Sequence, residues 1–335
     1  MRPIASEKVM QTAVQPASTD RSGGYFRPRR LGHVNLYVGD LERMMEFYKR
    51  VFGIEEVYRT PANGGGFLSN GNTHHDIAFL DGNTDLAKAR GAKPGQLNHL
   101  GFELGSEVEL VHDYERALEK GYRFMRTADH DIAHSVYHKD PNGLVYELYS
   151  DVVYDWRNQR SGIVTKPKPN WTPGSTPPIA EPLYHVDPEI RRVDGAIFHI
   201  ERASHATIVV DDIDATVDHY TEIVGLNVSG RGKGDSFVVL SGSCGERSLI
   251  VVPASRDVPA CYHHVSMPVI DPADLAKSVE RAKAEGVEIE VDITHAGRRS
   301  VFVRDPEGFL TQVYCDLDGE PRLDEVSPEL ALYVL

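Results

Sequence analysis

An internal repeat constrains the fold of this chain more than any other feature. The segment LGHVNLYVGDLERMMEFYKRVFGIE, from Leu31, aligns with ASHATIVVDDIDATVDHYTEIVGLN, from Ala203, at an offset of 172 residues. Later, NHLGFEL matches HHVSMPV and YHKDPNGLVYELY matches FVRDPEGFLTQVY at an offset of 165 residues. The chain therefore holds two copies of one module, and the second copy is shorter in its middle.

Each copy contains two units that combine one helix with several strands. An alternating apolar run, VNLYV or ATIVV, precedes an amphipathic helix that ends at Gly53 or Gly225. Further alternating segments follow, then a strand, a second helix and a hairpin that turns at Asp-Pro-x-Gly. This pattern predicts an α+β fold built as a tandem array.

The repeat also sets the expected boundaries. Residues 28–155 form the first module and residues 201–318 the second, with a tail expected to be flexible at 1–27 and a C-terminal tail at 319–335. Residues 156–200 are a Pro-rich linker. Its two tryptophans, Trp156 and Trp171, require an apolar surface, so we expect the linker to wrap a module.

Composition narrows the class of partner. The 335 residues carry a formal net charge of −14, which disfavours nucleic acid and anionic membranes because both would be repelled. The three cysteines form no CxxC pair, and no apolar run is long enough to span a membrane. We therefore expect a cytoplasmic protein, a homo-oligomer, that binds a small molecule.

Three ionisable residues of the first copy fall on separate predicted strands, namely His33, His99 and Glu147. Two histidines and one carboxylate are the ligand set of a non-haem Fe(II) site, which leaves coordination positions open. The residues could instead be hydrogen-bonded core histidines and a glutamate at a sheet edge. In LVYELY, however, Glu147 shares a face with Val145 and Tyr149, so it can point into a cavity.

The second copy serves as an internal control for this reading. The positions of the three candidate ligands are taken there by His205, His264 and Gln312. The exchange of the carboxylate for an amide leaves only neutral ligands, so metal affinity should fall severely.

One stretch resembles a known family. His130, Val136-Tyr137, Asp140-Pro141-x-Gly143 and Glu147 are spaced as in the signature of the type I extradiol ring-cleaving catechol dioxygenases of the vicinal oxygen chelate superfamily. Ala128 departs from that signature. The resemblance implies a vicinal oxygen chelate fold with two modules of paired βαβββ units, of which the first is catalytic and the second degenerate.

The resemblance also implies roles for individual residues. His33, His99 and Glu147 would bind Fe(II), or Mn(II), with dioxygen as co-substrate and a small aromatic diol as substrate. His75 would act as acid and base beside the dioxygen site, His130 would line the substrate pocket, and Tyr137 would hydrogen-bond a catechol oxygen. The product would be a ring-opened semialdehyde. The counterparts of the last three residues in the second copy are Arg247, His295 and Phe302.

Two other functions remain open. One is a different metal-dependent chemistry of the same superfamily, such as a glyoxalase-like isomerase or a transferase, and the other is a non-catalytic protein that binds aromatic ligands. Among the neighbouring residues, we expect His74 to be structural, on the strand face opposite His75, and His138 to lie at the surface. The place of His134 stays undecided, and Gly64 to Gly66 are expected to form a loop near the pocket mouth.

Overall fold

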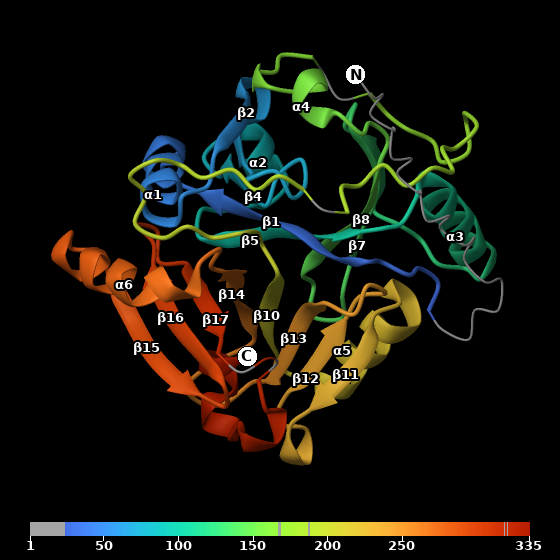
Figure 1. The fold of residues 1–335 in the computed structure, drawn as a ribbon. Coiled ribbons are helices and arrows are strands. Elements are labelled where there is room, and N and C mark those ends of the chain that lie inside the picture. Colours follow the sequence, from blue (N-terminus) through green and yellow to red (C-terminus); the bar gives the residue numbers. More distant parts are fainter. Residues whose placement is uncertain (1–23, 167–168, 187, 318, 320) are drawn as a thin grey trace, which may run out of the picture.

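The fold consists of two large β-sheets, one for each copy of the repeat (Figure 1). A computed structural model describes residues 24–335 except 167–168, 187, 318 and 320. The part of the predicted flexible tail that covers residues 1–23 therefore lies outside the described residues. Among the described helices, none is both long enough and apolar enough to cross a membrane.

The first sheet contains nine strands in the order β6-β7-β8-β5-β1-β4-β3-β2-β9. Its strands are β1 (Arg30–Val38), β2 (Glu56–Thr60), β3 (Gly65–Leu68), β4 (Ile77–Asp81), β5 (Gln96–Glu103), β6 (Arg126–Asp129), β7 (Ala133–Lys139), β8 (Val145–Asp151) and β9 (Gly162–Ile163). The helices are α1 (Leu41–Phe52), η1 (Pro61–Asn63), α2 (Asp85–Ala89), α3 (Glu107–Glu119) and α4 (Trp156–Gln159). Strands β1 and β5 pair antiparallel at the centre and join the two βαβββ units.

The second sheet repeats this topology with eight strands in the order β11-β12-β13-β10-β14-β17-β16-β15. Its strands are β10 (His205–Val210), β11 (Asn227–Arg231), β12 (Val238–Ser241), β13 (Arg247–Pro253), β14 (Cys261–Pro268), β15 (Ile289–His295), β16 (Arg298–Arg304) and β17 (Leu310–Asp316). Its helical segments are α5 (Ile213–His219), η2 (Tyr220–Val224), η3 (Lys233–Asp235), η4 (Pro272–Asp274), α6 (Leu275–Ala284), η5 (Leu323–Glu325), η6 (Pro328–Leu330) and α7 (Ala331–Val334). The predicted tandem arrangement of paired βαβββ units is thus confirmed.

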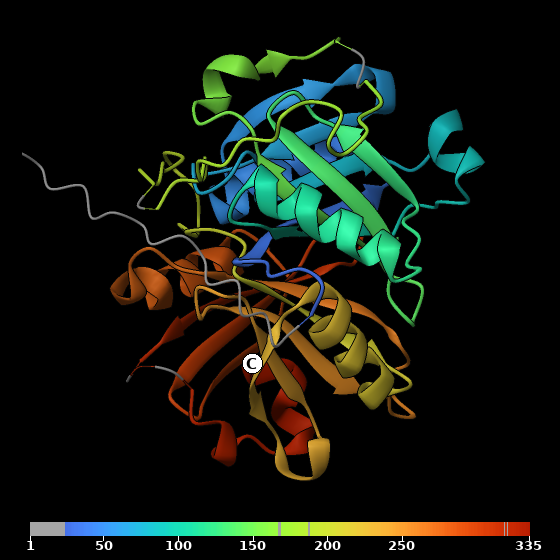
Figure 2. The same ribbon diagram turned by 90° about the vertical axis from the view of Figure 1, so that its right-hand side faces the viewer.

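One shared apolar core joins the modules, between the two sheets in Figure 2. It combines the helices of both modules with one face of each sheet, including Val34 and Leu36 of β1 and Leu148 of β8. Because side chains alternate along a strand, His33 and Glu147 point to the opposite face of the first sheet. These two candidate ligands therefore lie on the face that does not pack against the other module.

Reciprocal hydrogen bonds explain why a tyrosine and an aspartate recur in each copy. The Tyr48 hydroxyl of α1 donates to Asp305 in the turn of the second module (3.2 Å), and the Tyr220 hydroxyl donates to Asp140 in the turn of the first (3.3 Å). All four side chains are buried. The repeated Asp-Pro-x-Gly turns therefore hold the modules together in addition to forming hairpins.

The linker lies against the first module, as its tryptophans predict. Trp156 packs with Tyr58, Phe67 and Ile132, and Trp171 stacks on His134 at a ring distance of 4.4 Å. Both tryptophans are buried. At the N-terminal side of β1, Phe26 is also buried, in the core shared by the modules.

Candidate metal centre

Three neighbouring strands position the three candidate ligands. His33 is on β1, His99 on β5 and Glu147 on β8, and the register places His33 beside Gly101, which is beside Glu147. The glycine is required there, because a Cβ at residue 101 would lie 2.1 Å from Nε2 of His33. Because residue 101 of β5 has no side chain, the His33 imidazole has room between β1 and β8.

The donor atoms of these three residues converge on one point. Nε2 of His33 lies 2.9 Å from Oε2 of Glu147 and 3.2 Å from Nε2 of His99, and the His99 and Glu147 atoms are 2.8 Å apart. Ligands in adjacent octahedral positions about 2.1 Å from a metal are separated by roughly 3.0 Å. The spacing therefore fits one face of an octahedral site, with the remaining positions free.

The protonation states suit metal binding. Burial lowers the pKa of His33 to about 4, so its imidazole is neutral near pH 7, as a ligand must be. Burial alone would favour the neutral acid at Glu147, but His99 and His33 hold the pKa of this carboxyl well below its usual value. The Nδ1 atom of His99 contacts the Asn98 side chain, which leaves Nε2 to face the site.

Tyr137 and His130 extend the site away from the ligands. The Tyr137 hydroxyl donates to Oε1 of Glu147 (2.6 Å) and lies 2.9 Å from Nε2 of His130. Burial, followed by the Glu147 carboxylate, raises the pKa of Tyr137 well above its usual value, so its hydroxyl stays protonated. Tyr137 thus holds the second oxygen of the candidate metal ligand in place.

His75 lies over the ligand set, with its ring 4.0 Å from that of His33. Its Nε2–H donates to Oδ1 of Asn35 at 3.0 Å, and its buried Nδ1 has no hydrogen-bond partner among the described residues. Burial, followed by His33, lowers the pKa of His75 well below its usual value. His75 therefore presents a neutral imidazole with one nitrogen that has no hydrogen-bond partner among the described residues.

A cavity of about 370 Å³ opens onto this group. His75, His99, His130, Tyr137 and Glu147 line it, so it brings together every predicted catalytic residue and two of the three predicted ligands. Apolar and aromatic walls come from Tyr58, Phe67 and Leu80 and from linker residues Val164 and Pro169. The volume and lining suit a small aromatic molecule.

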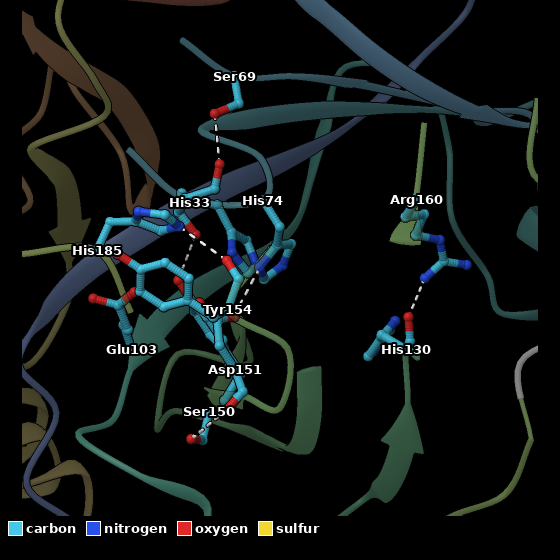
Figure 3. Close-up of polar contacts among 12 residues, drawn as sticks. His33, Ser69, His74, Glu103, His130, Ser150, Asp151, Tyr154, Arg160 and His185 are labelled. Carbon is cyan, nitrogen blue, oxygen red and sulfur yellow. Dashed lines mark hydrogen bonds and ion pairs between the residues drawn. The ribbon is translucent and has the colours of Figure 1, made fainter. Parts of the chain in front are cut away.

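The other candidate residues differ in part from expectation. His74 and His75 precede β4 in a loop, so the prediction that they lie on opposite faces of a strand is wrong, although His74 does have a structural contact, 3.1 Å from Asp151 (Figure 3). His138 is half-buried against Tyr122 and Tyr146, which corrects the predicted surface position.

His134, left undecided above, lies 2.6 Å from Glu107 and supports Trp171 of the linker. The glycines expected in a loop are divided, since Gly64 ends η1 whereas Gly65 and Gly66 begin β3.

The second module lacks a comparable centre. Within the described part of the chain, both groups of three closely spaced metal-binding side chains contain His33 and belong to the first module. In the second module Ser266 replaces Gly101 between His205 and Gln312, so that a side chain stands where the first module has none. The Gln312 amide donates to Ser300 at 2.8 Å.

Residues 326–335 also fill the face of the second sheet that corresponds to the cavity (Figure 1). The backbone carbonyl of Leu335 accepts hydrogen bonds from Nε2 of His205 (2.8 Å) and from Arg298 (2.7 Å). The ring of Tyr333 packs against Phe302, the counterpart of Tyr137. Residues 326–335 therefore close much of this face of the second module, and a cavity of about 280 Å³ remains beside His205, Arg247 and Arg298.

Sequence reasoning missed four contributors to the site, namely Asn35, Asn98, Gly101 and Arg160. The glycine left a signal in the sequence, because the repeat aligns Gly101 of NHLGFEL with Ser266 of HHVSMPV. Asn98 directly precedes the ligand His99, and Asn35 lies two residues after His33. Nothing in a single sequence indicates that these asparagines contact histidine side chains. Arg160 lies in the linker, where the repeat offers no comparison.

The fold and the site define a class of protein. The model of the Glyoxalase/Bleomycin resistance protein/Dioxygenase superfamily matches residues 30–148 and 202–313, and the chain belongs to this superfamily. The two matched segments lie within the two modules that the repeat predicts.

Among proteins of known activity, the chain is 29% identical over 122 residues to biphenyl-2,3-diol 1,2-dioxygenase 3 of Rhodococcus globerulus, which corresponds to 36% of this chain and 63% of the relative. It is 24% identical to catechol-2,3-dioxygenase of Bacillus subtilis (strain 168) over 78% of this chain and 90% of the relative. The match to the first relative thus spans less than two thirds of that relative's length.

Among solved structures, homoprotocatechuate 2,3-dioxygenase from Arthrobacter globiformis is similar in fold. The TM-score is 0.64 at 16% identity, with 94% of this chain and 89% of the other chain covered. This likeness extends over both modules.

Proposed function

We propose that the chain is an Fe(II)-dependent extradiol dioxygenase, which cleaves the ring of a catechol with dioxygen and gives a semialdehyde-type product. The observation that carries the proposal is the convergence of His33, His99 and Glu147, with donor atoms no more than 3.2 Å apart, at a cavity for a small aromatic molecule. The relatives named as catechol and biphenyl-diol dioxygenases support the same activity.

Bound Fe(II) supplies the open coordination positions and the redox chemistry that a reaction between a catechol and dioxygen requires. The chain itself holds and moves protons. His75 is the acid and base of the proposed reaction: its Nδ1 has no hydrogen-bond partner among the described residues, and because burial lowers its pKa, a proton taken up there is readily given back.

Tyr137 and His130 orient the substrate. The two side chains contact each other, Tyr137 is also bonded to Glu147, and both line the cavity. A diol bound beside Glu147 would therefore meet polar groups that are held in fixed positions.

Oxygen uptake by protein loaded anaerobically with Fe(II) tests the proposal. With a panel of catechols we expect consumption of dioxygen together with a yellow product. Glu147→Gln should lower metal affinity by at least about 100-fold, because loss of a supporting residue outside the ligand set already costs 10- to 100-fold. Glu285→Gln, at an exposed carboxylate of the second module, is the matched control and should behave as wild type.

Three results would contradict the proposal. Absence of oxygen uptake with every catechol would refute it. Conversion of a substrate without dioxygen would indicate an isomerase or a transferase instead. Tight binding of catechols that is unchanged in both Glu147→Gln and His75→Phe, with no turnover, would indicate a binding protein.

A further inference from the structure

Arg160 is a buried cation whose hydrogen-bonding capacity is largely unused. It follows α4 in the linker and is 2% exposed. Its Nη1 donates to the backbone carbonyl of His130, as Figure 3 shows. Its Nε and Nη2 are buried without a hydrogen-bond partner, and none of the carboxylates among the described residues forms an ion pair with it.

Such a group is costly unless something binds to it. Removing a guanidinium from water requires a compensating charge or hydrogen bonds. The two unused atoms, Nε and Nη2, form one edge of the guanidinium, and this edge matches the two oxygens of a carboxylate. The chain uses the same edge elsewhere, since Nε and Nη2 of Arg298 bind the two oxygens of Asp316 at 2.6 and 3.1 Å.

The surroundings of Arg160 select for an anion. It lines the cavity together with Arg90, Arg126 and Lys166, the last of which is paired with Asp131. Among the described residues of the lining, Glu147 is the single acidic one. Glu147 is assigned to the metal. The cavity of a protein with a net charge of −14 is therefore locally basic.

The position of Arg160 separates it from the diol end of the cavity. Tyr137 and His130 connect Glu147 to the guanidinium in space. The Tyr137 hydroxyl lies 2.6 Å from Glu147 and 2.9 Å from Nε2 of His130, and the His130 carbonyl accepts the hydrogen bond from Arg160. Figure 3 shows His130 and Arg160 apart from His33 and His74. A group bound by Arg160 would thus be a substituent of the ring and would not be one of the oxygens beside the metal ligands.

We propose that the substrate is a catechol that carries a carboxylate, and that the guanidinium of Arg160 binds this carboxylate. The inference rests on the proposed function for the identity of the diol. It adds that the substrate carries a negative charge, and it names Arg160 as the residue that recognises this charge.

Anaerobic calorimetry tests this with defined probes. The ligands are three catechols with a carboxylate on the ring next to the diol, on the ring farther from it, or on a one-carbon arm, each compared with its methyl ester. Wild type should bind at least one acid about 10- to 100-fold more tightly than its ester, the range expected for charged hydrogen bonds. Arg160→Met should abolish this preference without weakening the ester, and Arg160→Lys should retain part of it.

Arg157→Met is the matched control, because Arg157 is on the same short helix, pairs with Glu55 and does not line the cavity. It should keep the preference for the acid. The inference is overturned if wild type binds no acid better than its ester. It is also overturned if Arg160→Met weakens acid and ester equally, since Arg160 would then only position His130.

The two proposals fail in different ways. Binding of an acid through Arg160 without oxygen uptake would refute the dioxygenase proposal alone. Oxygen uptake with uncharged catechols and no preference for an acid would refute the role of Arg160 alone.

Discussion

Replacing Gly101 with alanine should remove the metal while the fold persists. The new Cβ would lie 2.1, 2.3 and 2.5 Å from three ring atoms of His33, whereas carbon atoms in contact are normally about 3.5 Å apart or more. The imidazole must therefore move by roughly 1 Å, although a metal site tolerates deviations of only about 0.2 Å in ligand distance. We expect Mn(II) affinity to fall by at least about 100-fold.

The fold should survive the substitution. One additional methyl group in a packed interior costs about 1–3 kcal/mol, which the protein can absorb if its stability is ordinary. Calorimetric titration with Mn(II), which needs no exclusion of oxygen, gives affinity and stoichiometry, and thermal unfolding reports the fold.

The control is Gly39→Ala, directly after β1. There the new Cβ would be 3.4 Å from its nearest neighbour, an ordinary contact. Gly39→Ala should bind Mn(II) as wild type does. If Gly101→Ala also binds one Mn(II) with unchanged affinity, the assignment of His33 as a ligand is wrong.

Three further predictions concern the second module and the interface. Gln312→Glu should leave the metal content at one ion per chain, because Nε2 of His205 is still bonded to the backbone oxygen of Leu335 and Ser266 still replaces Gly101; a second ion in elemental analysis would contradict this. Leu335→Ala, at a side chain 1% exposed, should lower the free energy of unfolding by about 2 kcal/mol in denaturant titrations with no change in metal content. Burial lowers the pKa of His219 from 6.5 to about 4, so the unfolded chain binds the proton first and stability falls as pH drops from 6.5 to 4. Unfolding temperatures at pH 7, 6 and 5 should therefore decline less steeply in His219→Gln, and equal slopes would refute this role of His219.

Much of the fold was predictable because it is repeated. Two alignable copies with the same apolar alternation indicate two similar sheets, and alternation in LVYELY correctly separates Glu147 from the core residues Tyr146 and Leu148. The difference between Glu147 and Gln312 pointed to the first module without any knowledge of geometry. Local patterning was less reliable before β4, where the loop that carries His74 and His75 follows no strand period.

The sequence by itself thus determined the architecture, the module that holds the candidate metal centre and the residue types in that centre, since these depend on patterns local to each strand. Tertiary structure alone decided the rest. The donor atoms of His33, His99 and Glu147 meet because strands distant in sequence are in register, and Arg160 reaches the cavity because the linker folds back over it. Residues 326–335 close the second module for the same reason, because contacts between distant segments depend on packing and leave no periodic signal in the chain.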